Sequence, residues 1–245
     1  MGLKGFSPEE RLFDICVYLR SFAVAFGGRA MNVSVVVENL PYLLRGLVST
    51  VEISAAVIVL GTAAGVLAGL LRFVPWMVLR TGIAWIVEFI RAVPLLLQIF
   101  FIFFGLPTIG LKIPTFPAAV LAMSLWMMAN TAEVVRGGIQ SIPRGQTEAA
   151  RSTGLSGIQM MRYVIFPQAI RRMLPPFVGL CTILIKDTSL AAIIGVFELT
   201  RAAQETIERT FRSFEIYLVA AAIYFCLSYP LSLLAEQAEA RLQRH

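Results

Sequence analysis

The stretch TEAARSTGLSGIQMMRYVIFPQAIRRMLPP, residues 147–176, is basic and interrupted by glycine and proline, although strongly apolar segments lie on both sides of it. Residues 146–153 favour a short helix, and Gly154 directly after them favours a left-handed helix end. A second helix is predicted to begin at Ser156, its N-cap, and to kink or end near Pro167. The pattern therefore predicts two short helices joined by a sharp turn, outside the apolar layer.

The chain as a whole has the composition of a membrane protein. Of its 245 residues, 58% are hydrophobic and only 15% are charged, and its mean hydropathy is +0.77. A soluble domain normally has about a quarter of its residues charged. The net charge of +6 is spread between apolar runs, so no nucleic-acid partner is expected. The three cysteines are far apart and indicate neither a disulfide framework nor a metal motif.

Five apolar segments are long enough to cross a bilayer, which takes about 20 helical residues. The predicted spans are 46–71, 82–107, 116–135, 175–197 and 216–235. We therefore predict an all-α, polytopic membrane protein with one transmembrane domain over residues 36–245. Residues 1–35 contain no run long enough to span, and we interpret them as an interfacial or dispensable N-terminal extension.

The positively charged residues favour one orientation of the chain in the membrane. The connection 108–115 holds only Lys112, whereas the segments on the other side of the membrane are rich in arginine. Those arginines are Arg72, Arg80, Arg136, Arg144, Arg151, Arg162, Arg171, Arg172, Arg241 and Arg244. The segment 198–213 holds three arginines and three glutamates. We predict an N-terminus outside, a cytoplasmic C-terminus, and a cytoplasmic location for residues 147–176.

Several ionisable side chains fall inside the predicted spans, where an isolated charge costs about 2.5–3.5 kcal/mol on insertion scales. They are Glu52, Glu88, Arg91, Lys186 and Asp187. One interpretation is a polar path for a charged or zwitterionic solute, which we favour for the group as a whole. In the other, Glu52 is hydrated near the outer end of its span and Glu88 pairs with Arg91. Lys186 and Asp187 then support the fold.

Two further features concern the shape and packing of the spans. Pro94 should kink the second span, and Gln98 one turn later is a candidate to face a pore. Gly61, Gly65 and Gly69 recur at four-residue spacing, which predicts a small-residue face for close helix packing.

No set of residues in the chain supports catalysis. The sequence lacks the glycine-rich phosphate loop with its lysine, and its single histidine is the last residue, His245. We therefore predict no catalytic residues, no metal site and no cofactor bound by this chain.

The residue types in the opening stretch resemble the EAA loop of ATP-binding-cassette (ABC) importer permeases. The matching positions are Glu148, Ala149, Ala150, Gly154, Val164, Phe166 and Pro167, within a loop of about 143–172. Val164 and Phe166 stand where the family has isoleucine and leucine. Four blocks resemble the polar amino acid branch of the family: NLPYLLRGLVSTVEIS from 39, FIRAVPLLLQIFFIFFGLP from 89, EVVRGGIQSIPRGQTEAA from 133, and IKDTSLAAIIGV from 185.

The resemblance implies a type I importer permease subunit in a bacterial inner membrane. It implies an identical or sibling permease as partner, a cytoplasmic ATPase that uses ATP and Mg²⁺, an extracytoplasmic binding protein, membrane lipid, and a polar or charged amino acid as substrate. It places Lys186, Asp187, Thr188 and Ser189 in the helix that lines the path. Two alternatives remain: a stand-alone channel or ion-coupled carrier whose basic loop binds lipid, and a scaffold or receptor without a solute path.

Overall fold

The computed structural model describes residues 33–243, which form helices and no strand. The α-helices are α2 (Val33–Leu71), α3 (Met77–Ala92), α4 (Leu95–Phe100), α5 (Thr115–Gln140), α6 (Arg144–Ser152), α7 (Gly157–Met160), α8 (Phe166–Asp187), α9 (Leu199–Thr210) and α10 (Ser213–Gln243). The shorter turns are the π-helices η1 (Phe101–Gly105) and η3 (Met161–Ile165) and the 3-10 helices η2 (Leu106–Ile109) and η4 (Thr188–Ile194). Of the predicted N-terminal extension, residues 1–32 lie outside the described part of the chain and residues 33–35 belong to α2.

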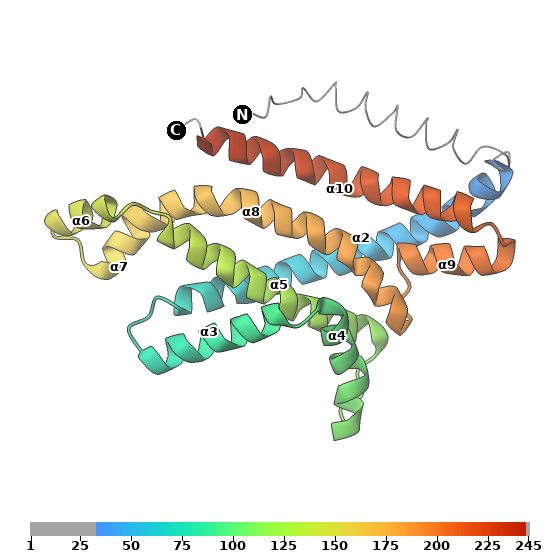
Figure 1. Cartoon of the computed structure of the whole chain (residues 1–245), viewed down its shortest axis with the longest axis horizontal. Coiled ribbons are helices and arrows are strands. Elements are labelled where there is room, and N and C mark those ends of the chain that lie inside the picture. Colours follow the sequence, from blue (N-terminus) through green and yellow to red (C-terminus); the bar gives the residue numbers. More distant parts are fainter. Residues whose placement is uncertain (1–32, 244–245) are drawn as a thin grey trace.

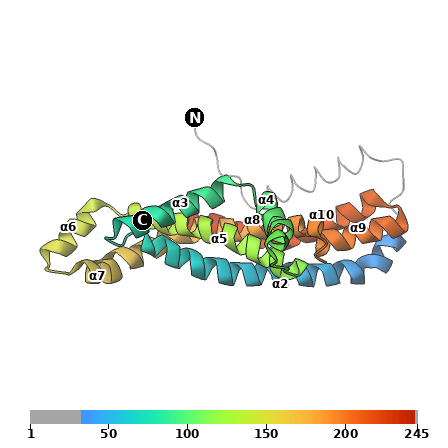
Figure 2. The same ribbon diagram turned by 90° about the horizontal axis from the view of Figure 1, so that it is seen from below.

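The long helices run side by side along the long axis of the molecule (Figures 1 and 2). Four helical segments of the described chain are long and apolar enough to cross a membrane, and a bent pair makes a possible fifth. The four are Ser34–Leu71, Thr115–Gln140, Gly157–Ile194 and Ser213–Gln237. The helices α6 and α7 lie at one end of this bundle and α9 at the other. The predicted all-α polytopic fold is confirmed.

The helices α2 and α5 pack closely because α2 presents glycines where α5 approaches. A Cβ atom added to Gly61, Gly65 or Gly69 would lie 2.6, 2.5 or 2.7 Å from the Cβ atom of Met127, Thr131 or Val135. No carbon atoms tolerate such distances, so only glycine admits this approach of the two backbones. The predicted small-residue packing face is therefore confirmed.

The predicted kink at Pro94 in the second span, 82–107, is confirmed, and it is a sharp bend. The helix α3 ends at Ala92, and the chain turns by 103° into α4 and the short helices that follow it. Val93 and Pro94 both adopt extended backbone angles there. Since proline lacks an N–H group, it leaves a carbonyl of the preceding turn without its helical donor. The Gln98 side chain compensates, donating hydrogen bonds to Ile90 O at 2.8 Å and Val93 O at 2.9 Å.

Most of the predicted fourth span, 175–197, lies in the longer apolar segment Gly157–Ile194, and Pro167 does not end its helix. The segments α7, η3 and α8 follow one another without a break, and Pro167 lies in the first turn of α8. A π-helical turn directly before a proline widens the helix, which relieves the clash of the proline ring with the preceding turn. The α-helix ends at Asp187, and η4 ends at Gly195, whose φ of 84° is left-handed.

The helix α9 was not predicted, because the charges of residues 198–213 indicated a connecting loop. Its buried residues nevertheless follow helical spacing: Leu199, Ala202, Ala203 and Thr206. Leu199, Ala202 and Ala203 pack with Leu43 of α2 and Ile216 of α10 in one apolar cluster. The periodicity of the small apolar residues was the signal that could have revealed this helix.

We expect Gly65→Ala to lower the free energy of unfolding by about 1–3 kcal/mol, because the new methyl group would push α5 away from α2. Thermal unfolding in detergent measures the change. Gly82→Ala is the matched control: this glycine lies on α3 with no atom near its Cβ position, so the same substitution should leave stability unchanged or slightly raised. Equal stability of the two variants would contradict the close packing of α2 on α5.

Candidate functional site

The helices α6 and α7 form a compact elbow, which we call the knob (Arg144–Ile165). Gly154 joins its two arms with a φ of 80°, a left-handed conformation that residues with side chains rarely adopt. Ser156 caps α7 in a capping box: its hydroxyl accepts from Gln159 N, and Gln159 Oε1 accepts from Ser156 N at 2.9 Å. The predicted glycine turn and serine cap are thus confirmed.

The EAA residues are divided between the surface and the interior of the knob. Glu148 and Ala149 are exposed on α6, whereas Ala150 is buried. Val164 and Phe166 are half-buried where η3 meets α8, and Pro167 is exposed. The knob therefore presents one acidic side chain and one small side chain outward, over a base that packs on the bundle.

The base of the knob is attached to three long helices. Ile165 and Met173 pack in one apolar cluster with Val135 of α5, and Phe73 at the end of α2 lies against it. Arg172 of α8 donates a hydrogen bond to the carbonyl of Ser141, which follows α5. Ser141, Arg172 and Met173 lie outside the knob and tie α8 to α5, so the direct attachment of the knob to the bundle is the cluster around Ile165, against which Met160, Met161 and Val164 also pack.

A cluster of ion pairs joins α2, α3 and α5 near the same end of the bundle. Glu133 accepts from Arg72 at 2.9 Å and from Nε of Arg136 at 3.0 Å, and it lies 3.8 Å from Arg91. Arg91 also pairs with Glu88 at 3.3 Å, as the alternative to a polar path described. The pair of Arg72 with Glu133 was not predicted, because the two residues lie 61 positions apart in the chain.

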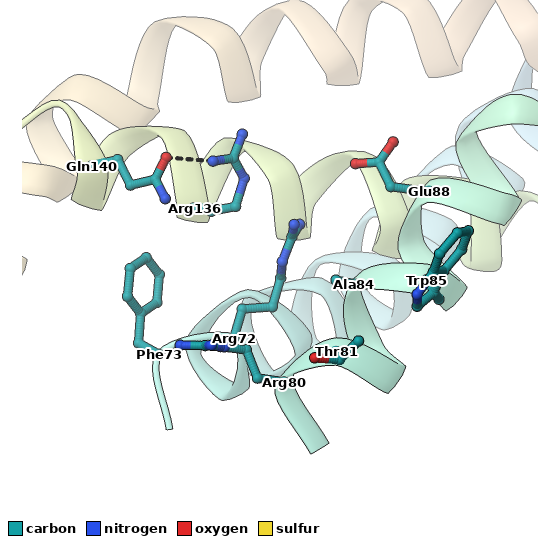
Figure 3. Close-up of a pocket in the computed structure, with 9 residues that line it drawn as sticks. All are labelled: Arg72, Phe73, Arg80, Thr81, Ala84, Trp85, Glu88, Arg136 and Gln140. Atoms are coloured by element: carbon teal, nitrogen blue, oxygen red, sulfur yellow. Dashed lines mark hydrogen bonds between the residues drawn. The ribbon is translucent and has the colours of Figure 1, made fainter. Parts of the chain in front are cut away.

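Two cavities border this cluster. One of about 590 Å³ is lined by Arg72, Arg80, Glu88 and Arg136, with Trp85 at its side (Figure 3). The other, of about 480 Å³, lies between α3, α5 and α8, and is lined by Arg91, Glu133 and Arg172 among others. Both cavities have charged walls and provide polar surface beside apolar helices.

The predicted path residues do not form one cluster. Glu52 is exposed on α2, and Lys186 is exposed at the end of α8 beside the half-buried Asp187. The next two residues bond within their own turn: Thr188 Oγ1 donates to Ile185 O and Ser189 Oγ to Lys186 O, both at 2.8 Å. No hydrogen bond or ion pair within residues 33–243 joins these positions to Glu88, Arg91 or Gln98.

A buried carboxylate network at the opposite end of the bundle was missed. Glu198 is completely buried and caps α9, accepting from Arg201 N at 2.7 Å, while the Tyr224 hydroxyl donates to its other oxygen at 2.7 Å. The Thr50 hydroxyl accepts from Leu199 N at 3.1 Å and so ties α2 to the same point. Burial raises the pKa of Glu198 above its ordinary value, and hydrogen bonds from Thr200 and Tyr224 oppose that rise.

Comparison with known proteins decides the family. Residues 34–244 match the family described as "Binding-protein-dependent transport system inner membrane component". The chain belongs to this family. It is 43% identical over 208 residues to the probable glutamine ABC transporter permease protein GlnP of Bacillus subtilis (strain 168), covering 83% of this chain and 95% of that one. It is 40% identical over 207 residues to the glutamine transport system permease protein GlnP of Escherichia coli (strain K12), covering 83% and 94%.

A solved structure supports the same assignment for the fold. It is the crystal structure of an amino acid ABC transporter with histidines, with a TM-score of 0.82 and 34% identity, covering 87% of this chain and 99% of that chain. The resemblance of the sequence to amino acid ABC importer permeases is thereby confirmed. As a member of this inner-membrane family, the chain is a multi-pass membrane protein.

Glu198→Ala should lower the free energy of unfolding by about 2–3 kcal/mol, because it leaves the buried donors of Arg201 and Tyr224 without an acceptor. Tyr224→Phe should cost about 1 kcal/mol, and the double variant less than the sum, since both substitutions remove one shared hydrogen bond. Glu52→Ala, at an exposed acid, is the control and should change stability by less than about 0.5 kcal/mol. Additive costs at Glu198 and Tyr224 would contradict the network.

Proposed function

We propose that the chain is the membrane-spanning permease subunit of an ATP-driven importer of a polar amino acid. Membership of a binding-protein-dependent transport family supports this proposal, as do the two relatives named for glutamine transport. Glutamine is therefore the first substrate to test. The observation that carries the coupling part of the proposal is the knob: a rigid elbow, exposed at its tip and attached at its base to the long helices.

The knob transmits motion between a partner ATPase and the membrane helices. Packed elements move as rigid bodies. A push on α6 and α7 therefore displaces α8, because α8 continues α7 through η3 without a break. The exposed Glu148 is available to a basic or amide-rich groove, and the exposed Ala149 admits close approach of a partner backbone. ATP and Mg²⁺ are bound and used by that partner, because this chain has no phosphate loop.

The remaining partners and the orientation complete the assembly. An extracytoplasmic binding protein delivers the amino acid, and a second permease, identical or sibling, forms the other half of the channel. The arginine-rich connections favour a cytoplasmic knob and C-terminus and an N-terminus outside. In support, the C-terminal end of α10 lies at the same end of the bundle as α6 and α7 (Figure 1).

Lys186 is the strongest candidate of the path residues. Its exposed ammonium group lies in the apolar segment Gly157–Ile194, and within the described residues it has no ion pair closer than 4.0 Å. An unpaired charge inside an apolar span is costly unless water or a substrate carboxylate meets it. The half-buried Asp187 and Ser189 extend this polar surface, whereas Thr188 is completely buried and Gln98 bonds to the backbone of its own bend. Glu52, Glu88 and Arg91 remain path candidates.

Gly154→Pro and Glu148→Arg should leave the protein in the membrane but uncouple ATP hydrolysis from uptake. Proline holds φ near −65° and cannot reach the 80° of this turn, and the arginine reverses the exposed charge. The assay is ATP hydrolysed per amino acid taken up, in proteoliposomes with the ATPase and binding protein. Gly157→Ala is the control for the same segment, since no atom lies near its Cβ position. Normal coupling in both variants would refute the knob as the coupling element, and solute flux without ATP or partners would favour a stand-alone carrier.

Lys186→Gln should slow uptake about tenfold at saturating binding protein, because it removes a charge-assisted hydrogen bond to the substrate carboxylate. The ATPase should copurify with this variant as it does with the wild type. This separates a defect in the path from a defect in folding. Lys112→Gln, at an exposed lysine in the 108–115 connection, should transport normally. If both lysine variants behave alike, Lys186 does not contact the substrate.

A further inference from the structure

The helix α3 carries three different surfaces along its length. One is buried against α5 and contains Ile83, Val87 and Ile90. A second lines the cavity of about 590 Å³ with Thr81, Ala84 and Glu88. The third is apolar and exposed, with Val78 88%, Trp85 73% and Phe89 70% exposed. A polar cavity therefore opens directly beside a surface that is suited to hydrocarbon.

The walls of this cavity carry more positive than negative charge. Around it and the adjoining ion cluster stand four arginines and two carboxylates: Arg72, Arg80, Arg91, Arg136, Glu88 and Glu133. Glu133 forms ion pairs with Arg72, Arg91 and Arg136, and Glu88 forms one with Arg91. Arg80 is exposed at the start of α3 and has no ion pair within residues 33–243. The cavity is thus suited to an anion that Arg80 can reach.

We propose that this cavity binds the phosphate headgroup of an anionic phospholipid, whose acyl chains lie on the exposed face of Trp85 and Phe89. Figure 3 shows Arg136 on one side of the cavity and Arg72 and Arg80 on the other, with Trp85 at the edge of the cavity. Arginine matches phosphate geometry through two parallel hydrogen bonds. Tryptophan is enriched at the level of the headgroups, where its ring meets the apolar layer and its N–H meets water.

A lipid fits this site better than the other sources of an anion or of an apolar partner. A free phosphate ion would leave Trp85 and Phe89 uncovered beside it. A second copy of this chain in a two-fold contact on this face would bring the same positively charged surface into the interface from the other side. Excess positive charge beside an apolar face is instead the pattern that recruits anionic lipid. The proposal requires only that the chain lies in a membrane, and it does not depend on coupling through the knob.

The test uses Trp85 as its own reporter. The chain has three tryptophans, so Trp76→Phe with Trp126→Phe leaves Trp85 alone. This protein is reconstituted in nanodiscs in which brominated phosphatidylglycerol or brominated phosphatidylcholine replaces part of the lipid, and fluorescence quenching gives the relative affinity. We expect phosphatidylglycerol to be preferred, and Arg80→Gln to reduce that preference about fivefold. Arg45→Gln, an exposed arginine near the other end of α2, should keep it.

The opposing outcomes are distinct. Equal quenching by the two lipids, or an unchanged preference in Arg80→Gln, would overturn the proposal. Loss of the preference on addition of inorganic phosphate would identify a free-anion site and reject the lipid. Quenching by neither lipid would mean that protein covers Trp85, which also rejects it. Because the measurement needs neither ATP nor partners, its failure would leave the transport proposal untouched.

Discussion

The close approach of α2 to α5 along Gly61, Gly65 and Gly69 positions most of the rest of the molecule. In a bilayer, apolar helices gain little from leaving lipid, so their association depends on dispersion contacts that only small residues permit. With the two backbones this close, Arg72 at the end of α2 reaches Glu133 on α5. The same carboxylate then attracts Arg91, which ties α3 to the pair.

Polar side chains join the helices wherever the apolar packing is interrupted. Glu133 gathers arginines from three helices at one end, and Glu198 joins α2, α9 and α10 at the other. At the bend after α3, Gln98 supplies the donors that Pro94 removes. Unsatisfied polar groups are costly where water is excluded, so these contacts tolerate little rearrangement. The bundle is therefore suited to moving as a rigid body.

The helix α8 connects the two regions that matter most for the proposed transport. It continues the knob through η3 without a break, and its last residues include Lys186 and Asp187. A helix rises 1.5 Å per residue and resists bending, so a displacement at the knob reaches the other end of α8. This continuity gives a physical route from a partner ATPase to the candidate path, and the helical run does not stop at Pro167.

The sequence by itself determined the membrane class, the apolar segments, the glycine face and the glycine-centred knob. All of these depend on local spacing or on residue types with one dominant conformational property. Only the tertiary structure decided that Glu133 meets Arg72 and that Glu198 is buried against Tyr224. Those features join residues far apart in the chain, and periodicity along one segment contains no information about which distant helix will lie beside it.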